Sequence, residues 1–293
     1  MEKEWAGTTY GNGWMHKWLI RMLRFIDVRI LYGFVSIFVI PVCLAINPSR
    51  RIIYQYLRKR HNYGIIKSAW LTYVNHCLFG QVVVDRFAMY AGKKFEVEID
   101  GYDNYLRLAD NTDGFIQLSA HIGNYEIAGY TLKAEKKLNA LVFFGEKESV
   151  MRNRQKMFST TNINMIAIRP DMGHLFEINA ALANGEVVSM PSDRVFGSDK
   201  HLSIKFLGGN AKFPYGPFSI ATLRGLGVIA VNVLKIASKK YKIIVTPLHY
   251  DVQASRKEQI RQLSSAYVKE LERVVNLYPT QWYNYFEFWN DNE

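Results

Sequence analysis

The most informative stretch of the sequence is Gly114-Phe-Ile-Gln-Leu-Ser-Ala-His-Ile-Gly-Asn-Tyr-Glu126, which predicts a strand, a turn and a helix with titratable side chains. Apolar residues 115–118 predict a buried strand, and a helix-like pattern over residues 125–138 follows it. His121 lies on the turn between them, where an imidazole can take a proton from a hydroxyl. Glu126 falls in the first helical turn, where the helix dipole favours an ionised carboxylate. We therefore predict that His121 is a general base and that Glu126 reaches back to orient it.

Two residues of the turn are predicted to shape this site and to contact substrate. Asn124 is a good candidate for the helix N-cap, because its side chain can accept from free backbone N–H groups. Gly123 permits a tight bend and lets a substrate approach the backbone. The alternative is that His121 and Glu126 serve stability alone, since motifs of this length also match by chance.

The composition narrows the class of partner. The chain has 293 residues, 49% of them hydrophobic, which is enough for one large core or two small ones. Its formal net charge of +11 favours a negatively charged partner, which could be an acidic protein, an anionic membrane or a nucleic acid. No zinc-finger spacing or basic nucleic-acid module occurs, so we expect no nucleic-acid partner. The two cysteines, Cys43 and Cys77, make neither a disulfide framework nor a metal cluster, which fits a reducing cytoplasm.

The first 60 residues point to a membrane. Lys17, Arg21 and Arg24 form a cationic stripe at helical spacing among tryptophan and aliphatic residues, as in an interfacial helix. An uncharged run over residues 30–46 follows, interrupted by Pro41. As a helix it would extend roughly 25 Å, short of a hydrocarbon core of about 30 Å.

The charges around this run favour an anchor over a spanning helix. Lys and Arg flank both of its ends, so the positive-inside rule gives no orientation. We predict a monotopic or re-entrant anchor over residues 1–60 and an α/β catalytic domain over residues 61–293. A full span and a pair of buried soluble helices are the alternatives. A signal peptide is not expected, because the apolar run starts late and lacks a cleavage site.

Alternating short strands and helices predict an α/β class with a mixed sheet flanked by helices. The predicted strands are residues 95–99, 115–118, 140–144, 164–168, 186–190, 204–206, 228–233 and 241–245. The predicted helices are residues 125–138, 149–160, 172–184, 217–224 and 255–277.

Other polar residues are candidates for substrate binding. Asp193 and Arg194 follow an apolar strand, and ligands gather at the carboxyl ends of such strands. Because His121 also follows a strand, we expect the two loops to share one edge of the sheet. Arg152 and Arg154 could meet an anionic group, or could form a solvated helix face.

Two other kinds of site find no support in the sequence. His174 and His201 match no metal-ligand spacing, so no metal site is predicted. No Gly-x-Ser-x-Gly elbow is present, so a direct transfer is favoured over a covalent acyl-enzyme.

Three further blocks follow the His121 block in order. They read Ala183-Asn-Gly-Glu-Val-Val-Ser-Met-Pro-Ser-Asp193, Ile204-Lys-Phe-Leu-Gly-Gly-Asn210 and Tyr278-Pro-Thr-Gln-Trp-Tyr-Asn-Tyr-Phe-Glu-Phe-Trp289. Together with the H-x4-E spacing of the first block, they resemble segments of the bacterial lipid A late acyltransferases. These are the lauroyl and myristoyl enzymes of the lysophospholipid acyltransferase superfamily, and the resemblance covers most of the chain.

The resemblance implies a glycerolphosphate-acyltransferase-like fold and an acyl transfer. The donor would be an acyl carrier protein or coenzyme A thioester, with no further cofactor. The acceptor would be a hydroxyl of lipid A, another glycolipid, an amino-acid lipid or an aryl-polyene-type lipid. His121 would be the base, Glu126 its partner, and Asp193 matches an acidic position of the family.

One departure concerns a family arginine, thought to contact substrate phosphate, that follows the central strand. Here residues 143–149 contain none, and Lys147, Arg152 or Arg154 are the candidates to substitute for it. We expect a monomer at the cytoplasmic face of the inner membrane. The rival hypotheses are a hydrolase that uses the same pair on water and a non-catalytic lipid-binding protein of this fold.

Overall fold

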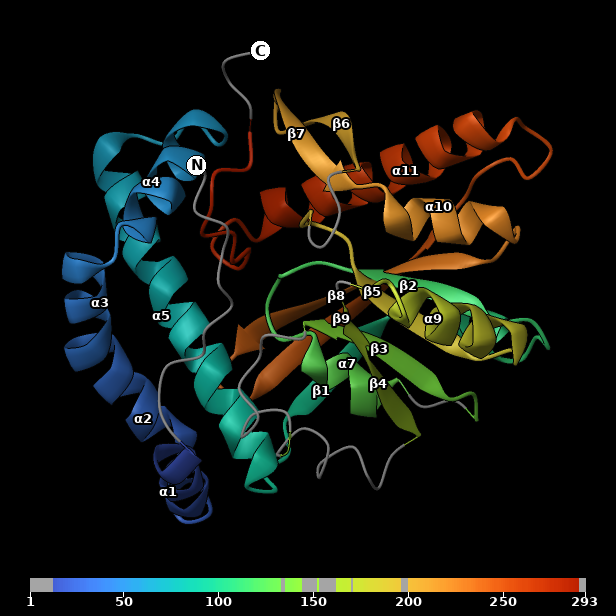
Figure 1. Ribbon diagram of the computed structural model, residues 1–293. Coiled ribbons are helices and arrows are strands. Elements are labelled where there is room, and N and C mark those ends of the chain that lie inside the picture. Colours follow the sequence, from blue (N-terminus) through green and yellow to red (C-terminus); the bar gives the residue numbers. More distant parts are fainter. Residues whose placement is uncertain are drawn as a thin grey trace.

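A seven-stranded mixed sheet organises the molecule, which a computed structural model describes over residues 13–132, 135–143, 152, 162–169, 171–195 and 200–289 (Figure 1). The strand order is β1-β9-β8-β2-β5-β3-β4, and every neighbouring pair is parallel except β8 and β9. The predicted mixed sheet is therefore confirmed. The strands of this sheet are β1 (Glu96–Asp100), β2 (Phe115–Ser119), β3 (Leu138–Phe143), β4 (Ile163–Ile168), β5 (Val187–Pro191), β8 (Val228–Ala237) and β9 (Lys240–Leu248).

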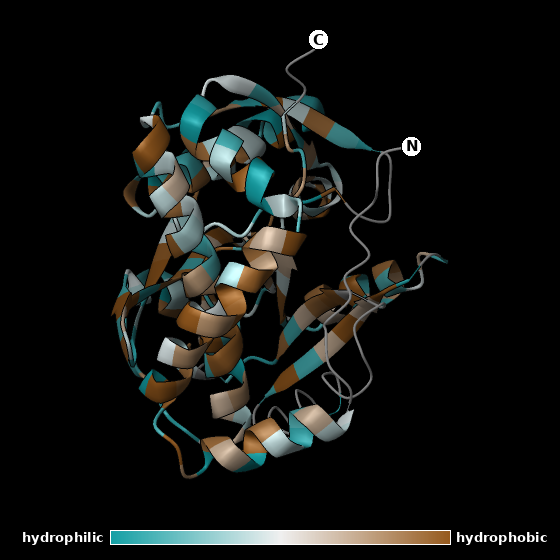
Figure 2. Cartoon of the chain, turned by 90° about the vertical axis from the view of Figure 1, so that its left-hand side faces the viewer, coloured by the Kyte–Doolittle hydropathy of each residue, from teal (hydrophilic) through white to brown (hydrophobic). Residues whose placement is uncertain are grey.

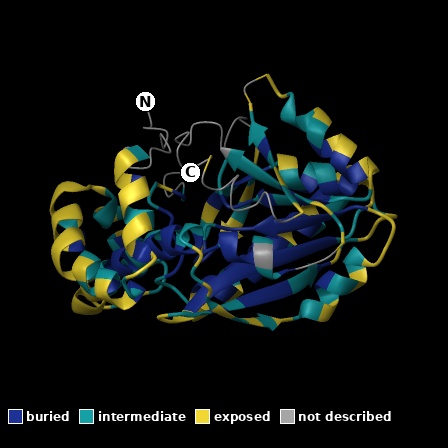
Figure 3. Ribbon diagram, turned by 90° about the horizontal axis from the view of Figure 1, so that it is seen from below, coloured by how far each residue is buried: buried dark blue, intermediate teal, exposed yellow. Residues whose placement is uncertain are grey.

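Helices cover both faces of the sheet, which explains why its central strands read as continuous apolar runs. All five residues of β2 are buried, and the sheet forms the dark blue centre of Figure 3. One face packs against α9, α10 and α11, and the other against α6 and α7. The bounds are α6 (Tyr102–Ala109), α7 (Glu126–Thr131), α9 (His174–Ala183), α10 (Gly216–Leu223) and α11 (Arg256–Leu277).

A separate antiparallel hairpin, β6 (His201–Phe206) and β7 (Gly209–Pro214), stands beside α11. Leu207 and Gly208 form its two-residue turn with positive φ angles of 48° and 78°. Only residues 204–206 were predicted as a strand here. The second strand was missed because Gly209 and Pro214 are poor strand formers.

The N-terminal third of the chain forms a helical layer against one side of the α/β unit (Figure 1). Its elements are α1 (Gly13–Leu23), α2 (Val28–Phe34), the π-helical turn η1 (Val35–Val39), α3 (Ile40–Ile46), α4 (Ser49–Lys59) and α5 (Ile65–Tyr90). The segments α2, η1 and α3 run on as one helix, Val28–Ile46, which we call the apolar helix. It is the one helix among the described residues that is long and apolar enough to cross a membrane, with 19 residues and a mean hydropathy of 2.2.

Buried polar contacts attach this layer to the sheet. Lys235 on β8 pairs with Asp85 on α5, and both are almost completely buried. Tyr32 on the apolar helix and Tyr241 on β9 donate their hydroxyls to the same carboxylate. A buried ion pair needs such additional hydrogen bonds to offset its desolvation, and here they join four elements.

α4 precedes the predicted domain boundary at residue 60, yet it contributes to the core of the α/β unit. Its buried residues Ile53, Tyr56 and Leu57 lie in the largest hydrophobic cluster. The Tyr56 hydroxyl donates to the carbonyl of Pro279, close to the C-terminal end. The helical layer and the sheet therefore share one continuous packing.

Candidate active site

His121 and Asp193 form the centre of the site. The imidazole Nδ1 lies 2.7 Å from Asp193 Oδ1, and the His121 backbone N–H donates to Asp193 Oδ2 at 2.9 Å. They come together because β2 and β5 are parallel neighbours that pair Ser119 with Pro191. Both side chains lie two residues beyond that pair, at one edge of the sheet. The prediction that the two loops share an edge is confirmed.

A tryptophan completes the surroundings of the carboxylate. The indole N–H of Trp282 donates to Asp193 Oδ2 at 3.0 Å. Trp282 is 1% exposed and packs edge-on against Tyr56 and Phe206. Both carboxylate oxygens thus accept hydrogen bonds, and the Asp193 side chain is buried, which holds it in one orientation.

These contacts also set the protonation of the pair. Burial lowers the pKa of the His121 imidazole, and the Arg194 guanidinium lowers it further, while Asp193 acts in the opposite direction. Burial by itself would raise the pKa of the Asp193 carboxyl, but the imidazole and Arg194 hold it well below its usual range. The stable arrangement is therefore a neutral imidazole beside a carboxylate. With the proton on Nδ1, Nε2 is the acceptor.

Glu126 does not hold His121, which corrects the partner predicted from the sequence. Its carboxylate pairs with Arg86 Nε at 2.9 Å and accepts from the Tyr90 hydroxyl at 3.1 Å. No hydrogen bond or ion pair joins Glu126 to His121 within the described ranges. The physical reason is the direction of α7, whose first turn presents Glu126 to α5 rather than to the turn before it.

Gly123 and Asn124 were predicted to contact substrate. In the structure, both turn residues contact other parts of the protein instead. Gly123 has a φ of 53°, and a Cβ there would lie 1.8 Å from the carbonyl oxygen of Val233. Its N–H donates to the Gln281 carbonyl, and the N–H of Asn124 donates to that of Val233. Asn124 is 1% exposed, and α7 begins at Glu126 after Tyr125, so Asn124 is not the N-cap. Glycine is required here for the close approach of β8.

The three predicted arginines differ in their placement. Arg194 lies beside the pair, donates to the Tyr283 carbonyl at 2.7 Å and covers the ring of Phe286. Arg152 is an exposed helical residue, whose neighbours in the sequence are not described. Arg154, Lys147 and nearly all of the helix predicted over residues 149–160 fall outside the described residues. Of these arginines, the structure brings Arg194 to His121.

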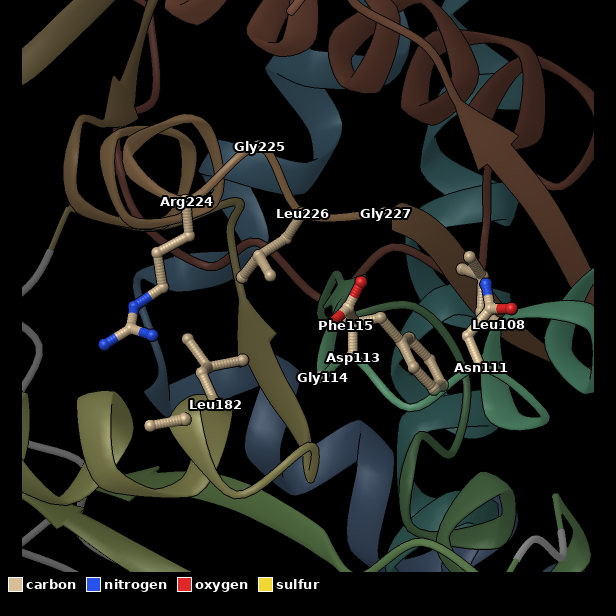
Figure 4. Close-up of a pocket in the computed structure, with 11 residues that line it drawn as sticks. Leu108, Asn111, Asp113, Gly114, Phe115, Leu182, Arg224, Gly225, Leu226 and Gly227 are labelled. Atoms are coloured by element: carbon tan, nitrogen blue, oxygen red, sulfur yellow. The ribbon is translucent and has the colours of Figure 1, made fainter.

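Two cavities lie near the sheet. A small one, of about 50 Å³, is lined by Glu126 and Tyr125 at one side and by apolar residues of β3 and β4 beyond them. A larger one, of about 300 Å³, lies where β2 and β8 begin, at their end remote from His121 (Figure 4). Asp113 and Arg224 are among its lining residues. The larger cavity therefore lies apart from the His121–Asp193 pair.

Comparison with known proteins identifies the family. The family described as bacterial lipid A biosynthesis acyltransferase matches residues 76–289, which include all of the residues around His121. The chain belongs to this family. It is therefore an acyltransferase, and the resemblance stated from the four sequence blocks is confirmed.

Other comparisons add less. No curated protein matches this acyltransferase. Among solved structures, it is similar to the 1-acyl-sn-glycerophosphate (LPA) acyltransferase PlsC from Thermotoga maritima, with 14% identity and a TM-score of 0.39. That match covers 90% of this chain and 97% of the other.

Three residues of the acyltransferase site were missed from the sequence: Arg86, Tyr90 and Trp282. Asp85 and Arg86 interrupt an apolar stretch of α5, and adjacent charges in such a stretch signal buried partners. Trp282 stands in the C-terminal block that carried the family resemblance, but only the fold shows its contact with Asp193.

Proposed function

We propose that this acyltransferase moves a fatty acyl group from a thioester to a hydroxyl of a lipid A-like or other glycolipid. The observation that carries the proposal is the His121–Asp193 pair at the edge of the sheet. His121 Nε2 takes the proton of the acceptor hydroxyl while the hydroxyl oxygen attacks the thioester carbonyl carbon. The carbon–sulfur bond then breaks, and the departing thiolate receives the proton from the imidazolium. Asp193 stabilises the imidazolium between these steps.

Glu126 has a different task in this proposal. Its carboxylate is 2% exposed and paired with Arg86, so it anchors the first turn of α7 to α5. That turn follows His121 by five residues, and Tyr125 within it touches the imidazole edge-on, with ring centroids 6.2 Å apart. Glu126 is thus a positioning residue that acts through the turn.

We also propose that the apolar helix lies in the plane of the membrane. Its exposed side chains are large and apolar, and Figure 2, which faces this side of the molecule, shows many brown hydrophobic residues along its helices. Lys17 and Arg21 on α1, and Arg24 just after it, are exposed beside the apolar helix, as expected for contact with lipid phosphates. The exposed apolar residues include Trp14, Trp18, Phe34, Ile37, Phe38, Val42, Ile46, Ile66 and Trp70.

The attachments of the apolar helix argue against a spanning orientation. At its start, Asp27 pairs with Lys239 at 2.6 Å, and Tyr32 donates to the Ser238 carbonyl. In its middle, the carbonyl of Ser36 accepts from Tyr73 on α5. After its end, α4 packs into the core of the α/β unit. A perpendicular helix would therefore draw the charged α/β unit into the hydrocarbon, which costs several kcal/mol per unpaired charge.

Membrane binding tests this orientation. Phe34→Ser/Phe38→Ser should reduce sedimentation with vesicles of bacterial phospholipids at least tenfold, because two large apolar side chains leave the lipid. The control Phe176→Ser/Leu223→Ser changes two exposed apolar residues elsewhere and should bind as the wild type does. Equal binding of all three proteins would refute the proposed face. The cytoplasmic side of the inner membrane follows from the donor, since acyl thioesters are made in the cytoplasm.

His121→Ala is the direct test of the reaction. Membranes that contain the protein are incubated with acyl carrier protein thioester, acyl-coenzyme A and lipid acceptors, and products are identified by mass spectrometry. We expect the transfer rate to fall by roughly 10²–10⁴, the usual contribution of a general base. Undiminished transfer would overturn the assignment. If the wild type releases free fatty acid and makes no acylated lipid, the protein is a hydrolase. If the thioester stays intact, the protein is a non-catalytic binding protein.

A further inference from the structure

The outer face of the β6–β7 hairpin is cationic. In its register, Ser203 pairs with Lys212 and Lys205 with Asn210, so these four side chains share one side. Leu202 and Phe206 point to the other side and join the hydrophobic core. We call these four positions, together with His201, the hairpin face; Lys212 is half-buried and the other positions are exposed. No carboxylate contacts Lys205 or Lys212 among the described residues.

Neighbouring residues extend this positive surface. The Arg60 guanidinium at the end of α4 stacks on Trp289 at 4.5 Å and lies against Gly209. Lys200 is exposed just before β6. The chain has no Asp or Glu between Lys200 and Tyr250, and none between Asp27 and Asp85. Within the described part of the C-terminal segment, which ends at Trp289, Glu287 is the one acidic residue, and Asp291 and Glu293 follow it in the sequence.

The hairpin face differs from the lipid-facing surface in chemistry and in position. None of the large exposed hydrophobic residues among the described ranges belongs to β6 or β7. Figure 1 places the hairpin at the top of the molecule beside α11, whereas the apolar helix forms the left-hand edge. A cationic surface without apolar side chains suits a charged protein partner better than insertion into lipid.

The hairpin is also close to the reacting residues. Phe206, on its inner side, packs edge-on against Trp282 with ring centroids 5.4 Å apart. Trp282 donates to Asp193, which holds His121. A partner bound to the hairpin face would therefore be next to the site, within reach of a long flexible arm.

We infer that the hairpin face docks the acidic carrier protein that delivers the acyl thioester, with Lys205 and Lys212 as its main contacts. The inference rests on the proposed transfer from a thioester and names the surface that recognises the donor. It follows that the enzyme distinguishes a protein-bound thioester from a small one by charge at the hairpin, while the chemistry at His121 is the same for both.

Lys205→Glu/Lys212→Glu tests the docking. With acyl carrier protein thioester, we expect KM to rise at least tenfold and kcat to stay within twofold of the wild type. With acyl-pantetheine, which has the same thioester but neither protein nor phosphates, both constants should be unchanged. Added salt should raise KM for the carrier thioester in the wild type more than in the variant, because salt screens exposed charges. Lys94→Glu/Lys257→Glu carries the same charge change on remote exposed residues and should behave as the wild type does.

Other results separate this inference from the proposed function. Unchanged KM for the carrier thioester in the hairpin variant overturns the docking surface, as does a wild type that uses only acyl-coenzyme A. No transfer from any thioester counts against the proposed function. In that case, binding of the carrier protein to His121→Ala, with and without the hairpin substitutions, still decides whether the surface exists. Loss of vesicle binding, with carrier binding intact, would make the hairpin a lipid contact and refute the inference.

Discussion

Two carboxylates near His121 come from different parts of the chain, and they have different partners. Glu126 is five residues away in the chain and lies at the start of α7, yet it pairs with Arg86 on α5. Asp193 is 72 residues away and follows β5, yet it holds the imidazole. The comparison shows that closeness in sequence gave the wrong partner and that strand register gives the right one.

The register explains this outcome in simple terms. Parallel pairing of Ser119 with Pro191 puts residues at equal distances beyond each strand at the same edge. His121 and Asp193 are both two residues beyond that pair. Glu126 instead follows a turn fixed by Gly123 against Val233, which directs α7 toward α5. The H-x4-E spacing therefore describes a turn and a helix start, and not by itself a hydrogen-bonded pair.

The largest expected effect comes from Asp193→Asn. The amide can present an N–H to Nδ1, which forces the imidazole into the tautomer with its proton on Nε2 and leaves no base. We expect kcat/KM to fall by roughly 10³–10⁴ with little change in fold. Steady-state kinetics with a thioester donor and lipid acceptor would measure it. A loss smaller than that of Glu126→Gln would reverse the comparison and return the orienting role to Glu126.

A smaller effect is expected for Glu126→Gln. The uncharged side chain leaves Arg86 without its carboxylate, and Arg86 is 18% exposed, so part of the lost pairing is replaced by water. We expect the free energy of unfolding to fall by about 1–3 kcal/mol and kcat by roughly tenfold, through movement of the turn. Chemical denaturation measures the free energy of unfolding, and steady-state kinetics measures kcat.

The partner Arg86 supplies the control for Glu126. If the two residues act as a pair, Arg86→Met/Glu126→Gln should be about as stable as Glu126→Gln alone, since the second change removes a charge that has already lost the Glu126 carboxylate. If the losses in the free energy of unfolding add, the Glu126 carboxylate and the Arg86 guanidinium stabilise the protein independently. A lower kcat in Glu126→Gln without any change in stability would indicate that Glu126 contacts the substrate directly.

Much of the fold was predictable because the central strands are long apolar runs bounded by turns. Strands near β2, β5, β8 and β9 were placed within a few residues, and so was α11. The helix predicted over residues 125–138 ends at Thr131, since β3 already begins at Leu138. α5 was missed entirely, because its hydrophobic residues surround the helix and give little periodicity.

The site was predictable only residue by residue. His121, Asp193 and Arg194 were selected because each follows an apolar strand, and strand ends meet at one edge. Their pairing needed the order β2-β5 in the sheet, which no local pattern encodes. The contacts of Arg86 and Trp282 join segments far apart in the chain, so only the assembled fold reveals them.

The smallest expected effect concerns the charge beside the pair. His121 must be neutral to act, and burial and Arg194 both lower the pKa of its imidazole, so activity should persist below the ordinary histidine pKa of about 6.5. Arg194→Gln removes one of these influences and raises the pKa. The acid limb of the kcat/KM profile should therefore move to higher pH, by less than about one unit. Arg194→Lys keeps the charge and should leave the limb in place. A limb that moves equally in both variants, or moves to lower pH in Arg194→Gln, would show that Arg194 acts through its hydrogen bond to Tyr283 and not through its charge.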